Sequence, residues 1–422
     1  MKLIKSFIFS IIALSLLLVP LSVNAETVDK WTTIEATIPE SKAFSTVVQL
    51  NDKAYIIGGS SGDTSFNQVK ILDLKNFTWS NGKEMPVARS AASAVVYDGK
   101  IYVVGGYTGN AYTWGKGVSL SSLQVYDPEL DTWTAKASMP QALGSTSAIV
   151  LDNKIYVFGG LTTNIRSVSS VQVYDPLTDS WSNKKDMQVA SHSQTSVTYN
   201  GKIYLIGGRH IDNATNVSIN SFLEYDPNAD SWITKNNLSI VRAAPNAVVY
   251  SNKIMVIGGN TGQGVGATES GTVESFDFEK NKWNNEASLN IARTSSGVFL
   301  YKGQIYVVGG TKSTVSNVPI NSIEVYGNPT KDPIPDPVPE PTGDRAILTV
   351  TLVTGITKEY DLSSDEVNNF INWYDNKDAG IGPSKYGIDK HDNNKGPFNK
   401  RIEYLIFGNI LTFEVNEYST KN

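Results

Sequence analysis

The stretch MPVARSAASAVVYDGKIYVVGG, from Met85 to Gly106, and the stretch SSLQVYDPELDTW, from Ser121 to Trp133, decide the fold of this 422-residue chain. The first stretch holds two apolar runs on either side of Asp98-Gly99-Lys100, a turn sequence that closes tight hairpins. The second stretch holds a third run, from Leu123 to Tyr126, and its tryptophan begins a fourth. Together the two stretches predict a unit of four short strands.

This unit recurs along the chain, and one of its landmarks is a Gly-Gly pair at the end of the second strand. The pairs follow one another at spacings of 47, 54, 48, 51 and 51 residues. They are Gly58/Gly59, Gly105/Gly106, Gly159/Gly160, Gly207/Gly208, Gly258/Gly259 and Gly309/Gly310. A period of about 50 residues is typical of an architecture that repeats one structural unit.

The tryptophans of the fourth strands run out of phase with the glycine pairs. They are Trp31, Trp79, Trp133, Trp181, Trp232 and Trp283. Five of them follow a glycine pair by 21 to 28 residues, whereas Trp31 precedes the first pair and no tryptophan follows the last. The offset predicts a ring in which residues 31–38 supply the outer strand of the last unit.

Residues 31–327 resemble kelch repeats, because each unit carries several of these landmarks in the same order. The resemblance implies an all-β fold, a six-bladed kelch β-propeller closed by an N-terminal strand. We expect the glycine pairs to turn the chain where a side chain would not fit. We expect the third-strand aromatic residues and the tryptophans to wedge between neighbouring blades, although Leu72 replaces the aromatic residue in the first blade.

The beginning of the chain predicts export. Residues 1–25 combine a short basic start, an apolar run from Phe7 to Val19 and small residues before Glu26, which is the pattern of a secretory signal peptide cleaved after Ala25. The chain has no cysteine, so the exported protein would be held by its core alone, and this pattern favours a bacterial source. We therefore expect a secreted protein with no membrane span after signal cleavage.

The segments after the repeats predict a linker and a second, smaller unit. The propeller would cover residues 26–327, and proline at nearly every second position predicts an extended linker over residues 328–343. Residues 344–422 predict a small α+β C-terminal module, in which Ser363 and Glu366 form a capping box that begins a helix. Nothing in these residues indicates the function of the module.

The composition argues against several classes of function. The net charge is -5, which does not indicate a nucleic-acid surface. The chain has three histidines, no cysteine and neither a phosphate loop nor a nucleophile elbow, so we expect no metal and no cofactor.

The kelch resemblance implies that ligands bind at one end of the central channel, on two sets of loops. One set follows the glycine pairs. The other joins each fourth strand to the next first strand, and it supplies Phe44, Ala91, Ser145, His192, Ala244 and Ser295. The candidate ligand-binding residues are Tyr107, Trp114, His192, Arg209, His210, Asn260, Arg242 and Arg293. Such a set suits a polar or anionic ligand, although arginines at these positions often bond loop carbonyls with their five donors.

These observations predict a secreted, non-catalytic recognition protein that binds an extracellular protein or glycan at the channel face. The same resemblance offers an alternative, a carbohydrate-active isomerase of the sialic-acid mutarotase type. Such an enzyme would need a carboxylate and an arginine that converge in the channel. Glu269 and Arg209 are the nearest candidates for this pair.

Overall fold

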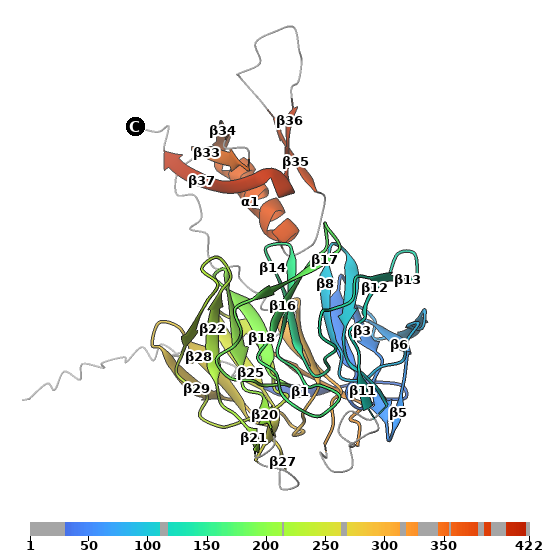
Figure 1. Ribbon diagram of the computed structural model, residues 1–422. Coiled ribbons are helices and arrows are strands. Elements are labelled where there is room, and N and C mark those ends of the chain that lie inside the picture. The colour runs from blue at the N-terminus through green and yellow to red at the C-terminus, as the bar shows by residue number, and fades with distance from the viewer. Residues whose placement is uncertain are drawn as a thin grey trace, which may run out of the picture.

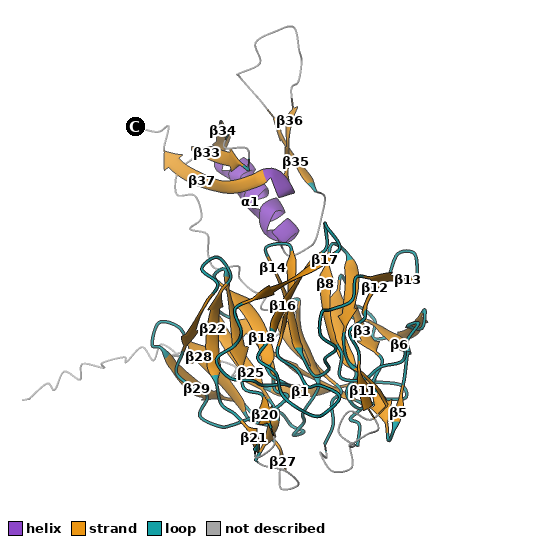
Figure 2. Cartoon of the chain, viewed as in Figure 1, coloured by secondary structure: helices purple, strands orange, loops and turns teal. Residues whose placement is uncertain are grey.

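The computed structural model describes residues 30–109, 117–212, 215–262, 268–312, 318–327, 345–353, 356–378, 384–389 and 402–418. Within these residues the repeats form six four-stranded antiparallel sheets (Figures 1 and 2). The first strand of each sheet lies beside the first strands of the two neighbouring sheets, so the sheets close into a circle. The β-propeller fold is therefore confirmed. The predicted signal peptide, residues 1–25, and the predicted linker, residues 328–343, lie outside the described residues.

Each sheet runs from an inner first strand to an outer fourth strand. In this order, the first two sheets consist of β2 (Thr46–Leu50), β3 (Lys53–Ile57), β6 (Val69–Asp73) and β7 (Trp79–Gly82), and of β8 (Ser93–Tyr97), β9 (Lys100–Val104), β12 (Leu123–Asp127) and β13 (Thr132–Lys136). The third and fourth sheets consist of β14 (Ser147–Leu151), β15 (Lys154–Phe158), β16 (Val171–Asp175) and β17 (Ser180–Lys184), and of β18 (Thr195–Tyr199), β19 (Lys202–Ile206), β22 (Phe222–Asp226) and β23 (Ser231–Thr234). The fifth and sixth sheets consist of β24 (Asn246–Tyr250), β25 (Lys253–Ile257), β28 (Val273–Asp277) and β29 (Lys282–Glu286), and of β30 (Gly297–Tyr301), β31 (Gln304–Val308), β32 (Ser322–Tyr326) and β1 (Trp31–Thr37).

The last of these sheets closes the ring with a strand from the other end of the repeat region. Strand β1 pairs antiparallel with β32, so that Trp31 lies opposite Tyr326 and Ile34 lies opposite Ile323. The rings of Trp31 and Tyr326 are 5.0 Å apart, and the Trp31 indole donates to the carbonyl of Ala287 at 2.8 Å. The predicted closure by an N-terminal strand is confirmed.

The tryptophans connect neighbouring sheets through hydrogen bonds as well as through packing. The indole of Trp133 donates to the carbonyl of Lys83 at 2.7 Å, and the indole of Trp181 donates to the carbonyl of Ala137 at 2.7 Å. Trp232 and Trp283 make the same bond to the sheet before them. Each bond joins an outer strand to the segment that leaves the previous outer strand, which explains why a tryptophan recurs at this position.

The interface between the first and last sheets is built differently. Leu72 and Trp79 face it, and within the described residues the buried indole nitrogen of Trp79 has no hydrogen-bond partner. A contact on the other strands compensates in part, because the Tyr301 hydroxyl donates to Asp52 at 2.7 Å. Leu72, which replaces the aromatic residue of the other units, is fully buried in this interface.

The glycine pairs occupy positions that no other residue would fill without strain. Gly105 and Gly106 have φ angles of 64° and 92°, in the left-handed region. A Cβ atom on Gly105 would lie 2.3 Å from the carbonyl oxygen of Leu143, and one on Gly106 would lie 2.8 Å from that of Ser90. The close approach of the connecting segments before and after this sheet therefore requires glycine here.

Beyond the predicted linker, the described residues contain a helix and two small sheets. Strands β33 (Arg345–Leu352), β34 (Thr357–Ser363) and β37 (Ile410–Tyr418) form one sheet, and β35 (Lys385–Asp389) pairs with β36 (Ile402–Ile406) in the other. A 3₁₀ turn, Phe407–Asn409, joins β36 to β37. The helix α1 (Ser364–Asp378) begins at the predicted capping box.

That capping box is reciprocal. The backbone N–H of Ser363 donates to the Glu366 carboxylate at 3.0 Å, and the backbone N–H of Glu366 donates to the Ser363 hydroxyl at 3.3 Å. Val367, Phe370 and Ile371 lie on the buried side of α1. In the part of the chain that is described, neither α1 nor any other helix has the length and apolar character needed to cross a membrane.

Candidate functional site

The two ends of the propeller carry different connections. At one end, two-residue turns such as Asn51-Asp52 join the first strand of a sheet to the second. At the other end, four glycine pairs lead into two-stranded hairpins, which project together at the bottom of Figure 1. These hairpins are β4 (Ser60–Ser61) with β5 (Thr64–Ser65), β10 (Tyr107–Gly109) with β11 (Gly117–Ser119), β20 (Arg209–Ile211) with β21 (Asn216–Ser218), and β26 (Asn260–Thr261) with β27 (Thr268–Glu269). We call this end the hairpin face.

A ring of residues in the left-handed backbone conformation surrounds the channel at the hairpin face. Its members have φ angles between 47° and 56° and are Phe44, Ala91, Ser145, Ser193, Ala244 and Ser295. Backbone N–H groups donate around the ring from Ala91 to Phe44 and onward to Ser295, at 2.7 to 3.2 Å. These bonds connect successive sheets where their first strands begin, so the mouth of the channel is rigid.

His192 lies in the predicted connecting loop, between β17 and β18, but the residue of that loop that belongs to the ring is its neighbour Ser193. Ser193 lies six residues after Met187, as Ala91 lies six residues after Met85 and Ser145 six after Met139. The constant spacing from the methionine was the signal in the sequence that locates the ring. His192 instead pairs through its backbone with Arg209.

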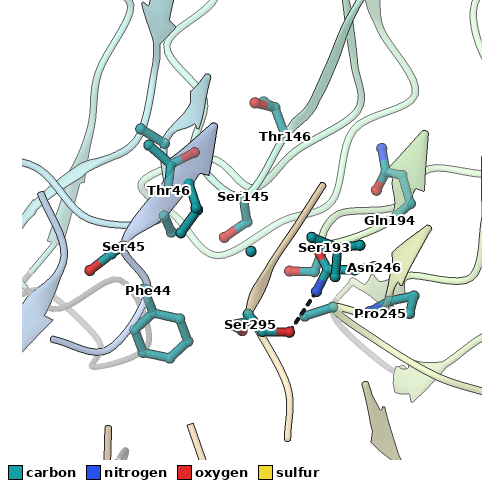
Figure 3. A pocket seen from close by; sticks show the side chains of 17 residues that line it. Phe44, Ser45, Thr46, Ser145, Thr146, Ser193, Gln194, Pro245, Asn246 and Ser295 are labelled. Carbon is teal, nitrogen blue, oxygen red and sulfur yellow. Dashed lines mark hydrogen bonds between the residues drawn. The ribbon is translucent and has the colours of Figure 1, made fainter. Parts of the chain in front are cut away.

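Inside the ring lies a cavity of about 200 Å³ (Figure 3). Hydroxyl, amide and small apolar side chains line it, among them Ser45, Thr146, Gln194 and Ser295, and no lining residue is charged. Pockets that bury a drug-sized ligand usually enclose about 300–1,000 Å³. The cavity therefore suits water or a small neutral group better than it suits an anionic ligand.

Arg242 and Arg293 lie away from this cavity, in the interior of the sheets. Both side chains are fully buried, and each guanidinium donates to the carbonyl of the first glycine of a pair, at 2.9 Å. Each also forms an ion pair of 2.6 Å, Arg242 with Glu274 and Arg293 with Glu324. Their donors are directed at loop carbonyls and buried carboxylates, the structural use that such arginines often have.

Tyr107 is also buried. Its hydroxyl donates to the carbonyl of Leu161 at 2.7 Å, and its ring packs where a side chain on Gly144 would have to sit. Trp114 lies outside the described residues.

Arg209 and Asn260 come together on the hairpin face, whereas the ring of His210 lies against other residues, with its Nδ1 at 2.7 Å from the carbonyl oxygen of Ala190. The Arg209 guanidinium donates to the side-chain oxygen of Asn260 at 3.0 Å and to the hydroxyl of Ser218 at 3.3 Å. His210 contacts the Asp212 carboxylate through Nε2 at 3.2 Å. Neither Arg209 nor Glu269 lines the channel cavity, so the pair considered for an isomerase does not converge there.

His192 is completely enclosed, with its Nδ1 at 2.9 Å from the Ser167 hydroxyl. Burial, followed by the charge of Arg209, lowers the pKa of His192 to about 3 from an ordinary value near 6.5. Since the unfolded chain takes up this proton first, the stability that the neutral imidazole contributes is complete above about pH 6.5. It is lost as the pH falls from there toward 3.

This pKa shift makes His192 a source of acid sensitivity. We expect the wild type to lose about 2–3 kcal/mol more unfolding free energy than His192→Thr between pH 7 and about pH 4.5. Threonine is the natural residue at the equivalent position, 294, so the variant should fold. Urea unfolding of both proteins at the two pH values measures the difference, and equal losses would show that His192 does not titrate as described.

The comparisons with known proteins agree with the fold. The family described as "Attractin/LZTR1 beta-propeller" matches residues 54–318. Beta-scruin of Limulus polyphemus is 28% identical, and the match covers 69% of this chain and 27% of that protein. Kelch repeat protein M-T8 of Myxoma virus is 26% identical over 64% of this chain and 41% of its own length.

Two further comparisons add a fungal relative and a solved structure. Kelch-like protein terF of Aspergillus terreus is 26% identical over 62% of this chain and 59% of its own length. The chain thus spans less than two thirds of each of these three relatives. The structure described as "Structure of YjhT" superposes with a TM-score of 0.60, at 16% identity over 77% of this chain and 99% of that one, which is a likeness of fold.

Proposed function

The chain belongs to the Attractin/LZTR1 family of kelch-type β-propellers, and from this premise we propose that it is an exported, non-catalytic recognition protein. Its hairpin face would hold an extracellular protein or glycan. The single observation that carries this proposal is the asymmetry of the two ends, with four projecting hairpins on one and two-residue turns on the other. Loops held by a rigid scaffold are where binding residues concentrate.

Three features of the hairpin face support recognition of a large ligand. The hairpins stand on glycine pairs that are fixed by backbone bonds from the connecting segments, such as Gly59 N–H to the carbonyl of Arg89 at 2.9 Å. The channel cavity is small and uncharged. The described residues also contain no group of three or more potential metal ligands. The hairpins together form a broad surface, and this surface offers a large ligand more area for contact than the channel cavity does.

One exposed aliphatic residue on each end gives a matched pair of variants. Val118, on β11 of the hairpin face, is 56% exposed, and Leu177, in a turn between third and fourth strands at the opposite end, is 83% exposed. We expect Val118→Asp to weaken binding at least tenfold and Leu177→Asp to leave it unchanged. A glycan array and a phage-displayed peptide library, each screened with the wild type and both variants, provide the measurement.

The comparison of the two variants shows which end of the propeller binds the ligand. Selective loss with Val118→Asp would support the hairpin face as the binding surface. Selective loss with Leu177→Asp, or equal binding by all three proteins, would contradict it. The wild-type protein should not accelerate the interconversion of sialic acid anomers, which proton NMR spectra follow directly. An acceleration that Glu269→Gln abolishes would show that the protein is an isomerase of the mutarotase type instead.

Export is the second part of the proposal, and the first 25 residues support it. Expression of the full chain in a secreting bacterial host should yield a protein outside the cells whose N-terminus is Glu26. N-terminal sequencing measures this directly. A protein that stays in the cells and keeps its first residues would contradict export.

A further inference from the structure

Strand β1 carries one residue more than the other five outer strands. The tryptophan of each of those strands precedes a methionine or a leucine by six residues, whereas Trp31 precedes Ile38 by seven. The extra residue accompanies the irregularity in the register of β1. In five interfaces the indole acceptor is the carbonyl of the fourth residue after the preceding tryptophan. Here that residue is Glu35, which lies within the irregularity, and this explains why the indole of Trp79 has no partner among the described residues.

The interface between the first and last sheets, which we call the seam, lacks a second link as well. At three other interfaces a third-strand tyrosine donates to an aspartate five residues later, and this aspartate accepts from a backbone N–H of the sheet before it. The links are Tyr126–Asp131–Lys83, Tyr174–Asp179–Ala137 and Tyr225–Asp230–Lys185, with bonds of 2.5 to 2.9 Å. Leu72 and Phe77 occupy the two positions at the seam, and neither side chain has a hydrogen-bonding group.

The interface between the fourth and fifth sheets shows how a missing tyrosine can be offset. Phe276 and Asn281 occupy the tyrosine and aspartate positions there. The interface keeps its indole bond, from Trp283 to the carbonyl of Asn236 at 2.7 Å, and the side chain of Asn236 donates to the carbonyl of Asn281 at 2.7 Å. In the part of the chain that the structure describes, the indole bond is missing at the seam alone. The outer strands of the seam therefore have the fewest bonds between them.

The inner part of the seam is held more firmly than the outer part. The first strands β2 and β30 are in close contact, because a Cβ atom on Gly297 would lie 2.1 Å from the Cβ of Val47. At the turn end of these strands, the Tyr301 hydroxyl donates to Asp52, and Asp52 also pairs with Lys75. Separation of the outer strands would leave both of these contacts in place.

Packing in the seam is also incomplete toward the hairpin face. A cavity of about 10 Å³, room for about one water molecule, lies between the two sheets. Ser45, Val47 and Ser295 line this cavity and the channel cavity alike. A wider seam would therefore enlarge the channel cavity at the wall between the first and last sheets.

We propose that the ring opens reversibly at the seam. The outer strands β1 and β7 separate, β1 stays paired with β32, and the contact of Tyr301 with Asp52 acts as the hinge. A closed ring of similar interfaces opens first where the fewest bonds must break, since local openings occur at the least stable contacts. The opening makes the size of the channel cavity variable, and it does not depend on the proposed function.

The test uses single cysteines, because the natural chain has none. Ala54→Cys places a thiol at a fully buried position in the seam, and Ile101→Cys places one at the equivalent, equally buried position between the first and second sheets. Ellman's reagent under native conditions should label Ala54→Cys at least about tenfold faster than Ile101→Cys. Low concentrations of urea should change the rate at position 54 less than at position 101, because a local opening exposes less surface. The cavity that Ile101→Cys leaves favours its labelling, so it works against the prediction.

A second variant tests the role of the extra residue. Deletion of the exposed Glu35 in the Ala54→Cys protein restores the spacing of six and returns an acceptor carbonyl to Trp79. It should slow the labelling about fivefold, as one regained hydrogen bond would. An unchanged rate would overturn the cause given for the opening.

The remaining outcomes decide whether the seam opens as a unit. In the wild type, the indole N–H of Trp31, which is bonded to the fifth sheet, should exchange with deuterium no faster than that of Trp181. Faster exchange at Trp31 would show that β1 leaves the ring altogether. Equal labelling of the two cysteines, or an equally steep dependence on urea, would overturn the opening at the seam. If Ala54→Cys does not fold, Leu72→Cys, also fully buried in the seam, gives the same measurement.

Discussion

Deletion of residues 26–38 is expected to lower the melting temperature by on the order of 10 °C or more. The deletion removes β1, and with it the buried side chains of Trp31 and Ile38 and the backbone pairing with β32. Loss of a buried tryptophan side chain alone costs about 3–5 kcal/mol. At about 2–4 °C per kcal/mol for a large domain, the tryptophan accounts for most of this shift, and the exposed edge of β32 adds to it.

The matched controls for this deletion keep the strand. Removal of residues 26–29 alone leaves β1 complete, and Thr33→Ala changes an exposed side chain within it. Both proteins should melt within about 2 °C of the wild type, since exposed substitutions usually change stability by less than about 0.5 kcal/mol. Differential scanning calorimetry of the four proteins provides the measurement. An unchanged melting temperature in the long deletion would show that β1 does not hold the ring closed.

Replacement of Glu324 by leucine is expected to cost about 3–5 kcal/mol of unfolding free energy, because it leaves the Arg293 guanidinium buried without its counter-charge. Glu324 also accepts from the backbone N–H groups of Asn290 and Ile291, at 2.6 and 3.1 Å. The carboxylate therefore holds both the arginine and the segment that leads to the last sheet. Urea unfolding at neutral pH gives the difference in free energy.

The repeat supplies controls for this prediction. Gln124 occupies the position equivalent to Glu324 in the sheet where Arg89 corresponds to Arg293, so Glu324→Gln should cost much less than Glu324→Leu. Leu223 takes that place where the arginine position holds Ser191, so the double variant Arg293→Ser with Glu324→Leu should recover part of the loss. If the double variant were less stable than Glu324→Leu alone, the cost would not come from the unpaired arginine.

The fold was predictable from the sequence because its determinants are local and repeated. Apolar runs, turn residues and glycine pairs occur in every unit, and the phase of Trp31 relative to the first pair was enough to predict the closure by β1. The α1 helix start was predictable for the same reason, since Ser363 and Glu366 satisfy each other within one turn.

The contacts of the candidate binding residues were predictable only in part. The arginine positions followed from the repeat, but the sequence could not show that Arg293 has a carboxylate beside it, because Glu324 is 31 residues away and reaches it from the third strand. The pairing of Asn260 with Glu269 depends on the register of the hairpin β26–β27. The sequence of the loop that joins these two strands does not recur in the other repeats. Register of this kind is set by the turn, which the repeat does not fix.

The most direct test of the closed ring is a disulfide between Thr37→Cys and Ser322→Cys. These residues are paired in β1 and β32, just beyond the irregularity in register that follows Ile34, and the natural chain has no cysteine to compete. We predict that the double variant forms an intramolecular disulfide quantitatively in the folded state, whereas Thr37→Cys with Thr234→Cys, on the distant β23, does not. Free thiols in the first variant under conditions that oxidise a model dithiol, or a disulfide in the second, would contradict the account.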